Sequence, residues 1–306
     1  MRTTRSGGAS ERASVPVRCY SMSQFVDLHC HSTASDGSLR PREVVRLAQR
    51  AGLSGLSLTD HDTIDGLAEA AEECARLGIA FVPGVEISCR WPFPGTLHIL
   101  GYCFDPQSAA ITRLCRRLVE ARRQRNPRMV SRLRELGVDI TMEELAAEAG
   151  GQIVGRPHMA AILVRKGYAG SIPHAFEKYL GPGRPAYFPK ETVEPREGIE
   201  AITEGGGVAV LAHPTQLKTK STDDLERILR DLMEMGLQGI EVMHCDHSRR
   251  DAEIMNGLAR RLGLLRTGGS DFHGNNKEGS ALGWAGDLRV PRAFMEELLT
   301  RRARAT

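Results

Sequence analysis

The chain has 306 residues, of which 41% are hydrophobic and 26% are charged, a composition typical of soluble globular enzymes. The formal net charge of +3 excludes a protein that coats nucleic acid through its overall charge, and the apolar runs, such as 208–212, are too short to span a bilayer. The seven cysteines contain no CxxC pair, which argues against a disulfide framework. We therefore expect a cytoplasmic protein with one large α/β domain or two ordinary ones.

The N-terminal segment is rich in Arg, Ser and Gly and lacks the apolar core of a secretory signal. We expect a disordered tail over residues 1–23, or a translation start at Met22. The composition also leaves an organellar targeting segment open as an alternative.

From residue 25 onward, short apolar runs alternate with helical patterns, as is typical of parallel βα units. Helices are predicted over 41–51, 65–77, 225–235 and 251–262, and each is followed by a glycine that can end it. This rhythm favours a barrel of βα units over a sandwich. Seven strands are predicted, over 25–29, 53–59, 80–87, 96–104, 207–213, 239–244 and 264–269.

One region, residues 107–195, interrupts this rhythm. We predict that it is a helical insertion that caps the substrate site and that the barrel is formed by residues 24–106 and 196–295. The first part of the insertion is strongly basic, because nine arginines lie between Arg113 and Arg134 against Glu120 alone. Such a run is either a solvated helix face or an electrostatic guide for a polyanionic substrate. The residues alone leave both interpretations open.

Nearly every predicted strand ends with a side chain that can bind a metal ion. His29 and His31 are two residues apart, so both imidazoles lie on one side of an extended backbone, and Cys30 faces the other side. Because the C-terminal ends of parallel barrel strands meet at one mouth, we expect these side chains to converge. The further candidates are Asp36, the segment Thr59-Asp60-His61-Asp62, Glu86, His98, His213, Asp271 and His273.

A single strand histidine is more often a buried core residue than a ligand. Here the interpretation as buried core residues would have to hold at every strand end. Burying each polar group without a partner would cost roughly 1–3 kcal/mol. A metal cluster removes this cost. Imidazole and carboxylate ligands without thiolate favour Mn, Zn or Fe(II), and Glu86 can bridge two ions in the arrangement used for displacement at phosphorus.

The motifs resemble those of the polymerase-and-histidinol-phosphatase (PHP) family of the amidohydrolase superfamily. The resemblance implies a distorted seven-stranded (β/α) barrel, in agreement with the strand count. It extends in the family's order from residue 25 to about 285. The matching segments are Asp27-Leu28-His29-Cys30-His31-Ser32, Leu58-Thr59-Asp60-His61-Asp62-Thr63, Gly84-Val85-Glu86, Ala212-His213-Pro214 and Ser270-Asp271-Phe272-His273.

The resemblance also implies two or three divalent metal ions, with Mn expected and Zn or Fe as alternatives. The implied ligands are His29, His31, Glu86 and Asp271 for the first ion; Glu86, His98 and His213 for the second; and Asp36, His61 and His273 for the third. All ligand positions are filled, which argues against a metal-free relative.

Within the family, the segments 154–160, 176–180 and 239–242 resemble the 3′,5′-nucleoside bisphosphate phosphatases and the ribonuclease AM type enzymes, which trim RNA from the 5′ end. The resemblance implies that Arg156, His158 and Lys178 bind phosphate. Without it, Gly155-Arg156-Pro157-His158 would be only a helix start. His247 follows the sixth strand, where a substrate contact and a plain loop residue are equally compatible with the sequence.

The implied reaction is hydrolysis of the 3′-phosphate of a nucleoside 3′,5′-bisphosphate by a metal-bridging hydroxide, with 5′–3′ trimming of short RNA as a second activity. Asp271 would ligate and relay a proton, and His158 would protonate the leaving group. The alternatives are a histidinol-phosphate phosphatase and, from another class, a non-catalytic metal- or nucleotide-binding protein. We expect no membrane association and no obligate protein partner.

Overall fold

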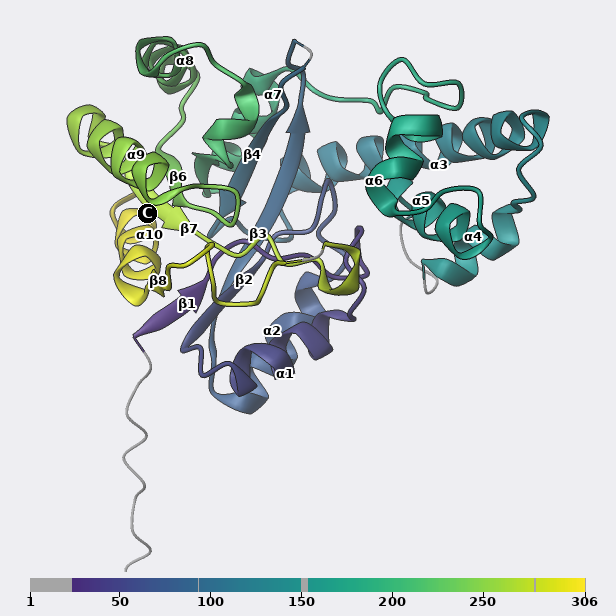
Figure 1. The fold of residues 1–306 in the computed structure, drawn as a ribbon. Helices are drawn as coiled ribbons and strands as arrows, with labels where there is room; N and C mark the ends of the chain where they lie inside the picture. The colour runs from purple at the N-terminus through teal and green to yellow at the C-terminus, as the bar shows by residue number, and fades with distance from the viewer. Residues whose placement is uncertain (1–23, 93, 150–153, 278, 306) are drawn as a thin grey trace, which may run out of the picture.

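The computed structural model describes residues 24–92, 94–149, 154–277 and 279–305, so the tail expected at 1–23 lies outside the described residues. All strands belong to one sheet in the order β7-β6-β5-β4-β3-β2-β1-β8, and helices surround it (Figure 1). The strands are β1 (Phe25–Asp27), β2 (Gly55–Leu58), β3 (Ala80–Cys89), β4 (Leu97–Tyr102), β5 (Val208–Leu211), β6 (Gly239–Met243), β7 (Leu265–Gly268) and β8 (Val290–Pro291).

The sheet curls into a nearly closed barrel, which confirms the predicted fold class. Leu28 N donates to the Gly268 carbonyl oxygen over 3.2 Å, and Cys30 pairs with Phe272 in a parallel bridge, so that β1 approaches β7. All seven predicted strands are present. The short β8 is an addition that the sequence pattern did not predict, and it pairs antiparallel with β1.

The direction of β4 corrects the expectation of parallel units. β4 is antiparallel to both β3 and β5. Its connection from β3 comprises only residues 90–96, too few for the crossover that a parallel return requires. The reversal brings the beginning of β4, not its end, to the mouth where the parallel strands finish. His98 lies at the second position of β4 and so reaches this mouth.

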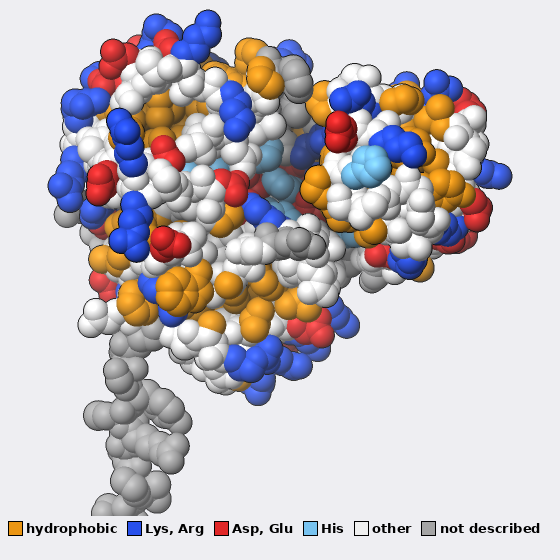
Figure 2. Space-filling model, viewed as in Figure 1, with side chains coloured by type: hydrophobic (Ala, Val, Ile, Leu, Met, Phe, Trp, Pro, Cys, Tyr) orange, Lys and Arg blue, Asp and Glu red, His pale blue; other side chains and the backbone are white. Residues whose placement is uncertain are grey.

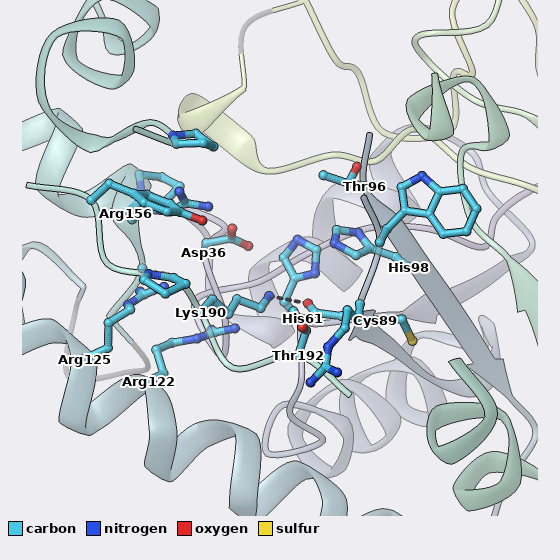
Figure 3. A pocket seen from close by; sticks show the side chains of 18 of the residues that line it. Asp36, His61, Cys89, Thr96, His98, Arg122, Arg125, Arg156, Lys190 and Thr192 are labelled. Atoms are coloured by element: carbon cyan, nitrogen blue, oxygen red, sulfur yellow. Dashed lines mark hydrogen bonds between the residues drawn. The ribbon is translucent and has the colours of Figure 1, made fainter. Parts of the chain in front are cut away.

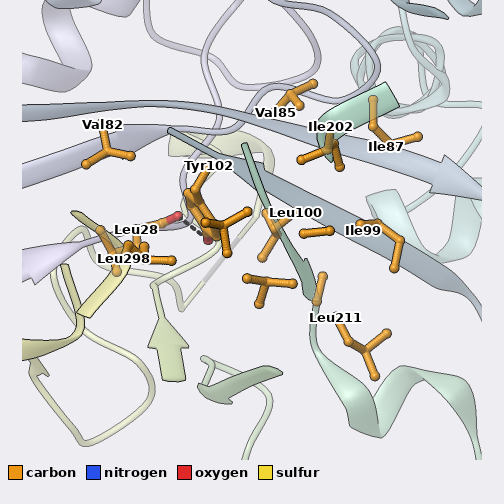
Figure 4. Packing of buried hydrophobic residues seen from close by; sticks show 14 of the residues in the cluster. Leu28, Val82, Val85, Ile87, Ile99, Leu100, Tyr102, Ile202, Leu211 and Leu298 are labelled. Atoms are coloured by element: carbon orange, nitrogen blue, oxygen red, sulfur yellow. Dashed lines mark hydrogen bonds between the residues drawn. The ribbon is translucent and has the colours of Figure 1, made fainter. Parts of the chain in front are cut away.

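The main core lies inside the barrel and beneath the helices that cover it (Figure 4). Leu28, Val82, Ile99 and Leu211 are fully buried there, and the Tyr102 hydroxyl donates to the Leu28 carbonyl oxygen over 2.8 Å. The helices are α1 (Pro41–Arg50), α2 (Leu67–Leu77), α3 (Ala109–Glu135), α4 (Met142–Glu148), α5 (Arg156–Arg165), α6 (Ile172–Ala175), α7 (Pro195–Glu204), α8 (Thr222–Glu234), α9 (Arg249–Leu262) and α10 (Arg292–Ala305), with short π and 3₁₀ turns at Phe176–Leu180, Pro214–Leu217 and Gly274–Asn276.

A second hydrophobic cluster lies among α4, α5, α6 and the end of α3, on the right in Figure 1. The long α3 connects the two clusters, because Leu114 and Leu118 belong to the barrel core whereas Met129 and Leu133 belong to the second cluster. The helical insertion is therefore built around a core of its own, and the exact division of the chain at 107 and 195 stays a prediction.

Two further observations concern the cysteines and the helices of the described residues. All six cysteines of the described residues are free, and five of them are buried. Within those same residues, none of the helices combines the length and apolarity that crossing a membrane requires.

Candidate metal centre

Glu86, on β3, lies at the centre of the predicted ligands. Its Oε1 atom is 2.8 Å from His98 Nδ1 and 2.8 Å from His213 Nε2. Its Oε2 atom is 2.9 Å from His61 Nδ1 and 3.3 Å from His31 Nε2. The side chain is 1% exposed, so imidazole nitrogens replace water around both oxygens. This is the environment of a carboxylate that bridges two ions.

Asp271, three residues after the end of β7, is a second carboxylate surrounded by basic groups. Its Oδ1 atom is 3.1 Å from His31 Nε2 and 3.4 Å from His29 Nε2. Its Oδ2 atom is 2.7 Å from Lys277 Nζ and 3.3 Å from His244 Nε2. The backbone φ of Asp271 is +48°, a conformation that residues other than glycine rarely adopt. Such strain is maintained by the surrounding contacts and is concentrated at functional sites.

The three residues predicted for a third ion also lie together. His273 Nε2 is 3.3 Å from Asp36 Oδ1, and the His273 ring stacks on His31 with centroids 4.1 Å apart. His61 lies on the other side of His31, at 4.7 Å between centroids. The potential ligand atoms of His31, Asp36, His61 and His273 all lie within 4.8 Å of one another. The structure thus brings every predicted ligand to one mouth, while their distribution among individual ions stays a prediction.

Metal binding accounts for a group of unsatisfied polar atoms at this mouth. Among the described residues, six buried atoms of the centre form no hydrogen bond: His29 Nε2, His31 Nδ1 and Nε2, His61 Nδ1, Glu86 Oε2 and His213 Nδ1. Each would cost roughly 1–3 kcal/mol if it were left without a partner. Their oxygen and nitrogen neighbours are close but poorly aligned for hydrogen bonds, as expected of lone pairs that point toward common ions. Imidazole and carboxylate ligands fit Mn, Fe or Zn.

The pKa values in the centre follow from burial and from mutual charge. Burial lowers the pKa of His61 and of His213 to about 4, so both rings are neutral at pH 7 and have a free lone pair. Burial also opposes protonation of His31, but the neighbouring carboxylates of Asp271 and Glu86 outweigh it and raise the pKa to about 10. A divalent ion would replace the proton on His31, because metal binding and protonation compete for the same lone pair.

Two buried carboxylates, Glu241 and Asp60, support the first histidines and the loop that follows them. Glu241, on β6, lies 2.9 Å from His29 Nδ1 through Oε1 and accepts from His213 N over 2.8 Å through Oε2. Asp60 accepts hydrogen bonds from Ser32 and Ser35, which shape the loop after His31. Such outer contacts fix which ring nitrogen of a histidine faces the metal.

A basic wall faces the metal centre across a cavity. We use this name for the side chains of Arg122, Arg125, Arg156 and Lys190. Asp62 Oδ2 is 2.7 Å from Arg122 Nη2 and 2.8 Å from Lys190 Nζ. Asp62 Oδ1 accepts from Ser88 N over 2.8 Å, which ties this ion cluster to β3. Burial would raise the pKa of Asp62, but the charges of Lys190 and Arg122 outweigh it and hold the pKa well below its usual range. One carboxylate therefore faces two cations, and a positive charge remains.

Two further arginines of the wall have neutral partners. Arg125 donates to the side-chain oxygen of Asn126 over 2.9 Å, and Arg156 donates to the Leu180 carbonyl oxygen over 3.3 Å. Arg156 also lies over the rings of Phe176 and Tyr187, at 5.7 and 5.4 Å from the centroids. Burial and the neighbouring arginines lower the pKa of Arg125 to about 9. An anion bound here would relieve this repulsion.

The cavity has a volume of about 780 Å³ and opens between the barrel and the insertion. Figure 2 shows the recess between these two bodies, with histidines at its floor. In Figure 3, Arg122, Arg125 and Arg156 lie on one side, Thr96 and His98 lie on the other, and Asp36 and His61 lie between them. Such a volume is in the range of pockets that bury most of a small ligand.

The four predicted substrate contacts differ in position. Arg156 lines the cavity. His158 is buried at the start of α5, next to the lining residues Arg156 and Pro157 but outside the lining set itself, and its Nδ1 accepts from Gly155 N over 3.0 Å. Lys178 is exposed, and its ammonium donates to the Tyr168 carbonyl oxygen over 3.1 Å, outside the set of lining residues. His247 is buried behind His244, at 5.3 Å between ring centroids, and also lies outside that set.

The structure reveals further residues of the site that the sequence patterns missed. His244 ends the predicted sixth strand, so the rule that found the other ligands applies to it as well; its ligand atom, with those of His29 and Asp271, could hold an ion. Arg122 and Lys190 come from distant segments and meet at Asp62, which belongs to a candidate segment of the sequence. The nine arginines of α3 carry no pattern that separates buried Arg122 and Arg125 from the seven exposed ones.

The fold and this centre define a metal-dependent hydrolase of the barrel type. Residues 27–244 match the model of the PHP domain, and the chain belongs to that family. It is 36% identical over 264 residues to a 3′,5′-nucleoside bisphosphate phosphatase of Chromobacterium violaceum, covering 86% of this chain and 92% of that one. It is 35% identical to a 5′-3′ exoribonuclease of Haemophilus influenzae (82% and 91% covered).

Two further similarities bear on the activity. The chain is 36% identical to a phosphoribosyl 1,2-cyclic phosphate 1,2-diphosphodiesterase of Eggerthella lenta, covering 81% of this chain and 94% of that one. A solved structure from Bifidobacterium adolescentis, described as a metal-dependent phosphoesterase, superposes with a TM-score of 0.80 at 32% identity over 91% of this chain and 96% of that one. These relatives are all phosphoric ester hydrolases by name, which sets the catalytic class of this chain.

Proposed function

We propose that the protein removes the 3′-phosphate from nucleoside 3′,5′-bisphosphates and trims short RNA from its 5′ end. The observation that carries the proposal is the pairing of two anion sites in one cavity. The carboxylate and imidazole centre receives the scissile phosphate, and the wall of Arg122, Arg125, Arg156 and Lys190 receives a second one. The bisphosphate phosphatase and exoribonuclease relatives support this choice of substrate.

The metal ions, which we propose to be Mn with Zn or Fe as alternatives, would lower the pKa of bound water and neutralise charge on the scissile phosphate. His29, His31, Glu86 and Asp271 would hold the first ion, as the resemblance implies. The planar guanidinium of Arg156, fixed by its contacts with Leu180 and Tyr187, suits a phosphate with two oxygens facing it. Lys190 contributes a point charge beside it.

RNA trimming extends the same binding mode. The first nucleotide of a 5′-phosphorylated RNA has phosphates on both its 5′ and 3′ oxygens, as the free bisphosphate does. The seven exposed arginines of α3 offer a basic surface to nucleotides beyond the second one of a longer strand. The free thiols are typical of a reducing compartment, and we propose that the protein acts in the cytoplasm.

Two alternative functions leave features of the cavity unexplained. Histidinol phosphate has an ammonium group where the proposed substrate has its second phosphate, and the four cations of the basic wall would repel it. A non-catalytic metal- or nucleotide-binding protein would not need its metal ions and a substrate phosphate in the same cavity. Lys178 and His247 lie outside that cavity, and we do not propose them as phosphate ligands.

The test is phosphate release by the Mn-loaded protein from adenosine 3′,5′-bisphosphate, histidinol phosphate, a 1,2-cyclic ribose phosphate and a 5′-phosphorylated RNA. We expect release of the 3′-phosphate from the bisphosphate and stepwise release of mononucleotides from the RNA. Turnover of histidinol phosphate alone would overturn the substrate assignment. Tight metal binding without turnover of any of the four would favour the binding protein.

Arg156→Ala is expected to raise KM for adenosine 3′,5′-bisphosphate by about 10- to 100-fold, the effect of losing a charge-assisted hydrogen bond of about 1.5–3 kcal/mol. For adenosine 3′-monophosphate, which lacks the second phosphate, we expect less than about a threefold change. Steady-state kinetics with both substrates measure the difference. The control is Arg165→Ala, which removes an exposed arginine of the same helix. Equal losses on both substrates would contradict a role for Arg156 in binding the second phosphate.

His158→Gln tests the proposed proton donor. Because Nδ1 contacts Gly155 N, Nε2 is the ring nitrogen that can face the leaving group. A general acid contributes about 10²- to 10⁴-fold to a reaction with a basic leaving group, so kcat on the bisphosphate should fall by at least about 100-fold. With p-nitrophenyl phosphate, whose leaving group needs no proton, the fall should be small. Exposed His174→Gln is the control, and equal falls on both substrates would rule out proton donation by His158.

A further inference from the structure

We propose that Trp91 stacks on the base of the nucleotide that follows the scissile phosphate in RNA, and that it thereby determines how well the protein uses RNA relative to free bisphosphate. This inference rests on the proposed function. Trp91 lines the same cavity as the metal centre and the basic wall. An indole offers the large flat face on which any base stacks, so such a contact favours nucleic acid without selecting a sequence.

The location of Trp91 relative to the two phosphate sites carries the argument. Trp91 belongs to the β3–β4 connection together with Thr96, and the Gly95 backbone packs on the indole, since a Cβ at Gly95 would lie 2.8 Å from Trp91 Cδ1. Thr96 lies across the cavity from Arg156, with Asp36 and His61 between them (Figure 3). Trp91 and the basic wall therefore flank the metal centre.

The connectivity of RNA matches this arrangement. The scissile phosphorus has two ester oxygens, the O3′ of the first nucleotide and the O5′ of the second, and the bonds of a tetrahedral phosphorus diverge. With the first nucleotide directed toward the arginines by its 5′-phosphate, the second must extend away from them. Hydrolysis adds the oxygen of water to phosphorus and breaks the P–O3′ bond; O3′ takes a proton, and the phosphate stays on the second nucleotide.

The indole is held rigidly enough to act as a stacking platform. Its Nε1 donates to the Leu217 carbonyl oxygen over 3.2 Å. On the same connection, Thr96 N donates to the Gln216 carbonyl oxygen over 3.0 Å, so the β3–β4 connection is attached to the 3₁₀ turn at Pro214–Leu217. The aromatic rings of the opposite wall already contact Arg156, which leaves Trp91 as the aromatic face for a second base among the described lining residues.

The experiment compares kcat/KM for three substrates: adenosine 3′,5′-bisphosphate, the 5′-phosphorylated dinucleotide of adenosine, and the same dinucleotide with an abasic ribose in the second position. For the wild-type protein, removal of the second base should lower kcat/KM by about 5- to 100-fold, the range of base–aromatic stacking. For Trp91→Ala, the two dinucleotides should be used equally, and the ratio of dinucleotide to bisphosphate turnover should fall by the same factor.

Trp91→Phe keeps an aromatic face and should retain most of the preference for the intact dinucleotide, which guards against a general disturbance of the connection. Trp284→Ala removes the chain's other tryptophan, which is 42% exposed and lies outside the set of lining residues, and should leave the ratio unchanged. Equal use of the intact and abasic dinucleotides by the wild-type protein would overturn the inference, as would equal losses on dinucleotide and bisphosphate. Failure of the proposed function is distinct, because the wild-type protein would then turn over none of the three.

Discussion

Glu86→Gln is expected to abolish metal binding at the centre and to lower kcat/KM on nucleoside bisphosphate by more than about 100-fold. Loss of a residue that only hydrogen-bonds to a metal ligand lowers metal affinity or activity by about 10- to 100-fold. Glu86 is itself placed as a ligand, with five histidines at 2.8–3.4 Å around it, so its loss should have a larger effect. Glutamine has the same shape but lacks the negative charge, and its amide nitrogen would face imidazole lone pairs. Elemental analysis of the purified variant and phosphate-release kinetics measure the two effects.

The matched control for Glu86→Gln is Glu69→Gln, a partly exposed carboxylate on α2 that pairs with Arg42 at the surface. It should retain metal content and activity, because surface ion pairs contribute little to stability. A Glu86→Gln protein with full metal content and normal turnover would show that Glu86 is not the central ligand.

Asp62→Asn is expected to destabilise the protein by about 3 kcal/mol, because removing one partner of a buried ion pair leaves the remaining charge without compensation. In this case Arg122 and Lys190 would face each other without a carboxylate, and the side chain of Arg122 is only 6% exposed. Urea unfolding of the variant, followed by circular dichroism, should give a lower midpoint at an unchanged slope. The basic wall should also bind bisphosphate less selectively, since its two cations lose their common anchor.

The pH dependence of this effect has a defined direction. The pKa of Asp62 is depressed in the folded protein, so its contribution to stability is complete above the unfolded-state pKa of about 3.9 and is lost as the pH falls toward the folded-state value. The difference in unfolding free energy between wild type and Asp62→Asn should therefore shrink when the pH is lowered from about 5 to about 3.

The control for Asp62→Asn is Asp65→Asn, an exposed carboxylate three residues later, for which we expect no such loss. If Asp62→Asn unfolded at the wild-type urea concentration at pH 7, the ion cluster of Asp62, Arg122 and Lys190 would not stabilise the folded protein.

The metal centre was predictable because its residues follow strand ends, a local feature of the sequence. His29 and His31 are two residues apart just after β1, and Glu86, His213 and Asp271 each follow an apolar run. The strand reversal at β4 was not predictable from the apolar pattern, which is the same in both directions. Its signal was the short connection at 90–96, and His98 reaches the centre because of that reversal.

The substrate side of the cavity was less predictable, because it depends on contacts between distant segments. Arg122 and Asp62 are 60 residues apart, and only the packing of α3 on the barrel selects that arginine from its neighbours. Lys190 comes from a connection without regular structure. The resemblance implied that Lys178 binds phosphate, whereas in the structure its side chain is exposed and donates to the Tyr168 carbonyl oxygen. Local patterns identify groups that end an element, but not those brought together by tertiary packing.

The closure of the barrel between β1 and β7 has a consequence for synthesis of the chain. Buried Asp27 accepts backbone hydrogen bonds from His29 nearby, and also from Ser270 and Gly283, which lie 243 and 256 residues farther along. His29 and His31 lie on one side of this closure, and Asp271 and His273 lie on the other. A nascent chain therefore cannot assemble the centre until its C-terminal strand has left the ribosome. Metal acquisition becomes a late, post-translational event, and a prematurely terminated chain would lack the site.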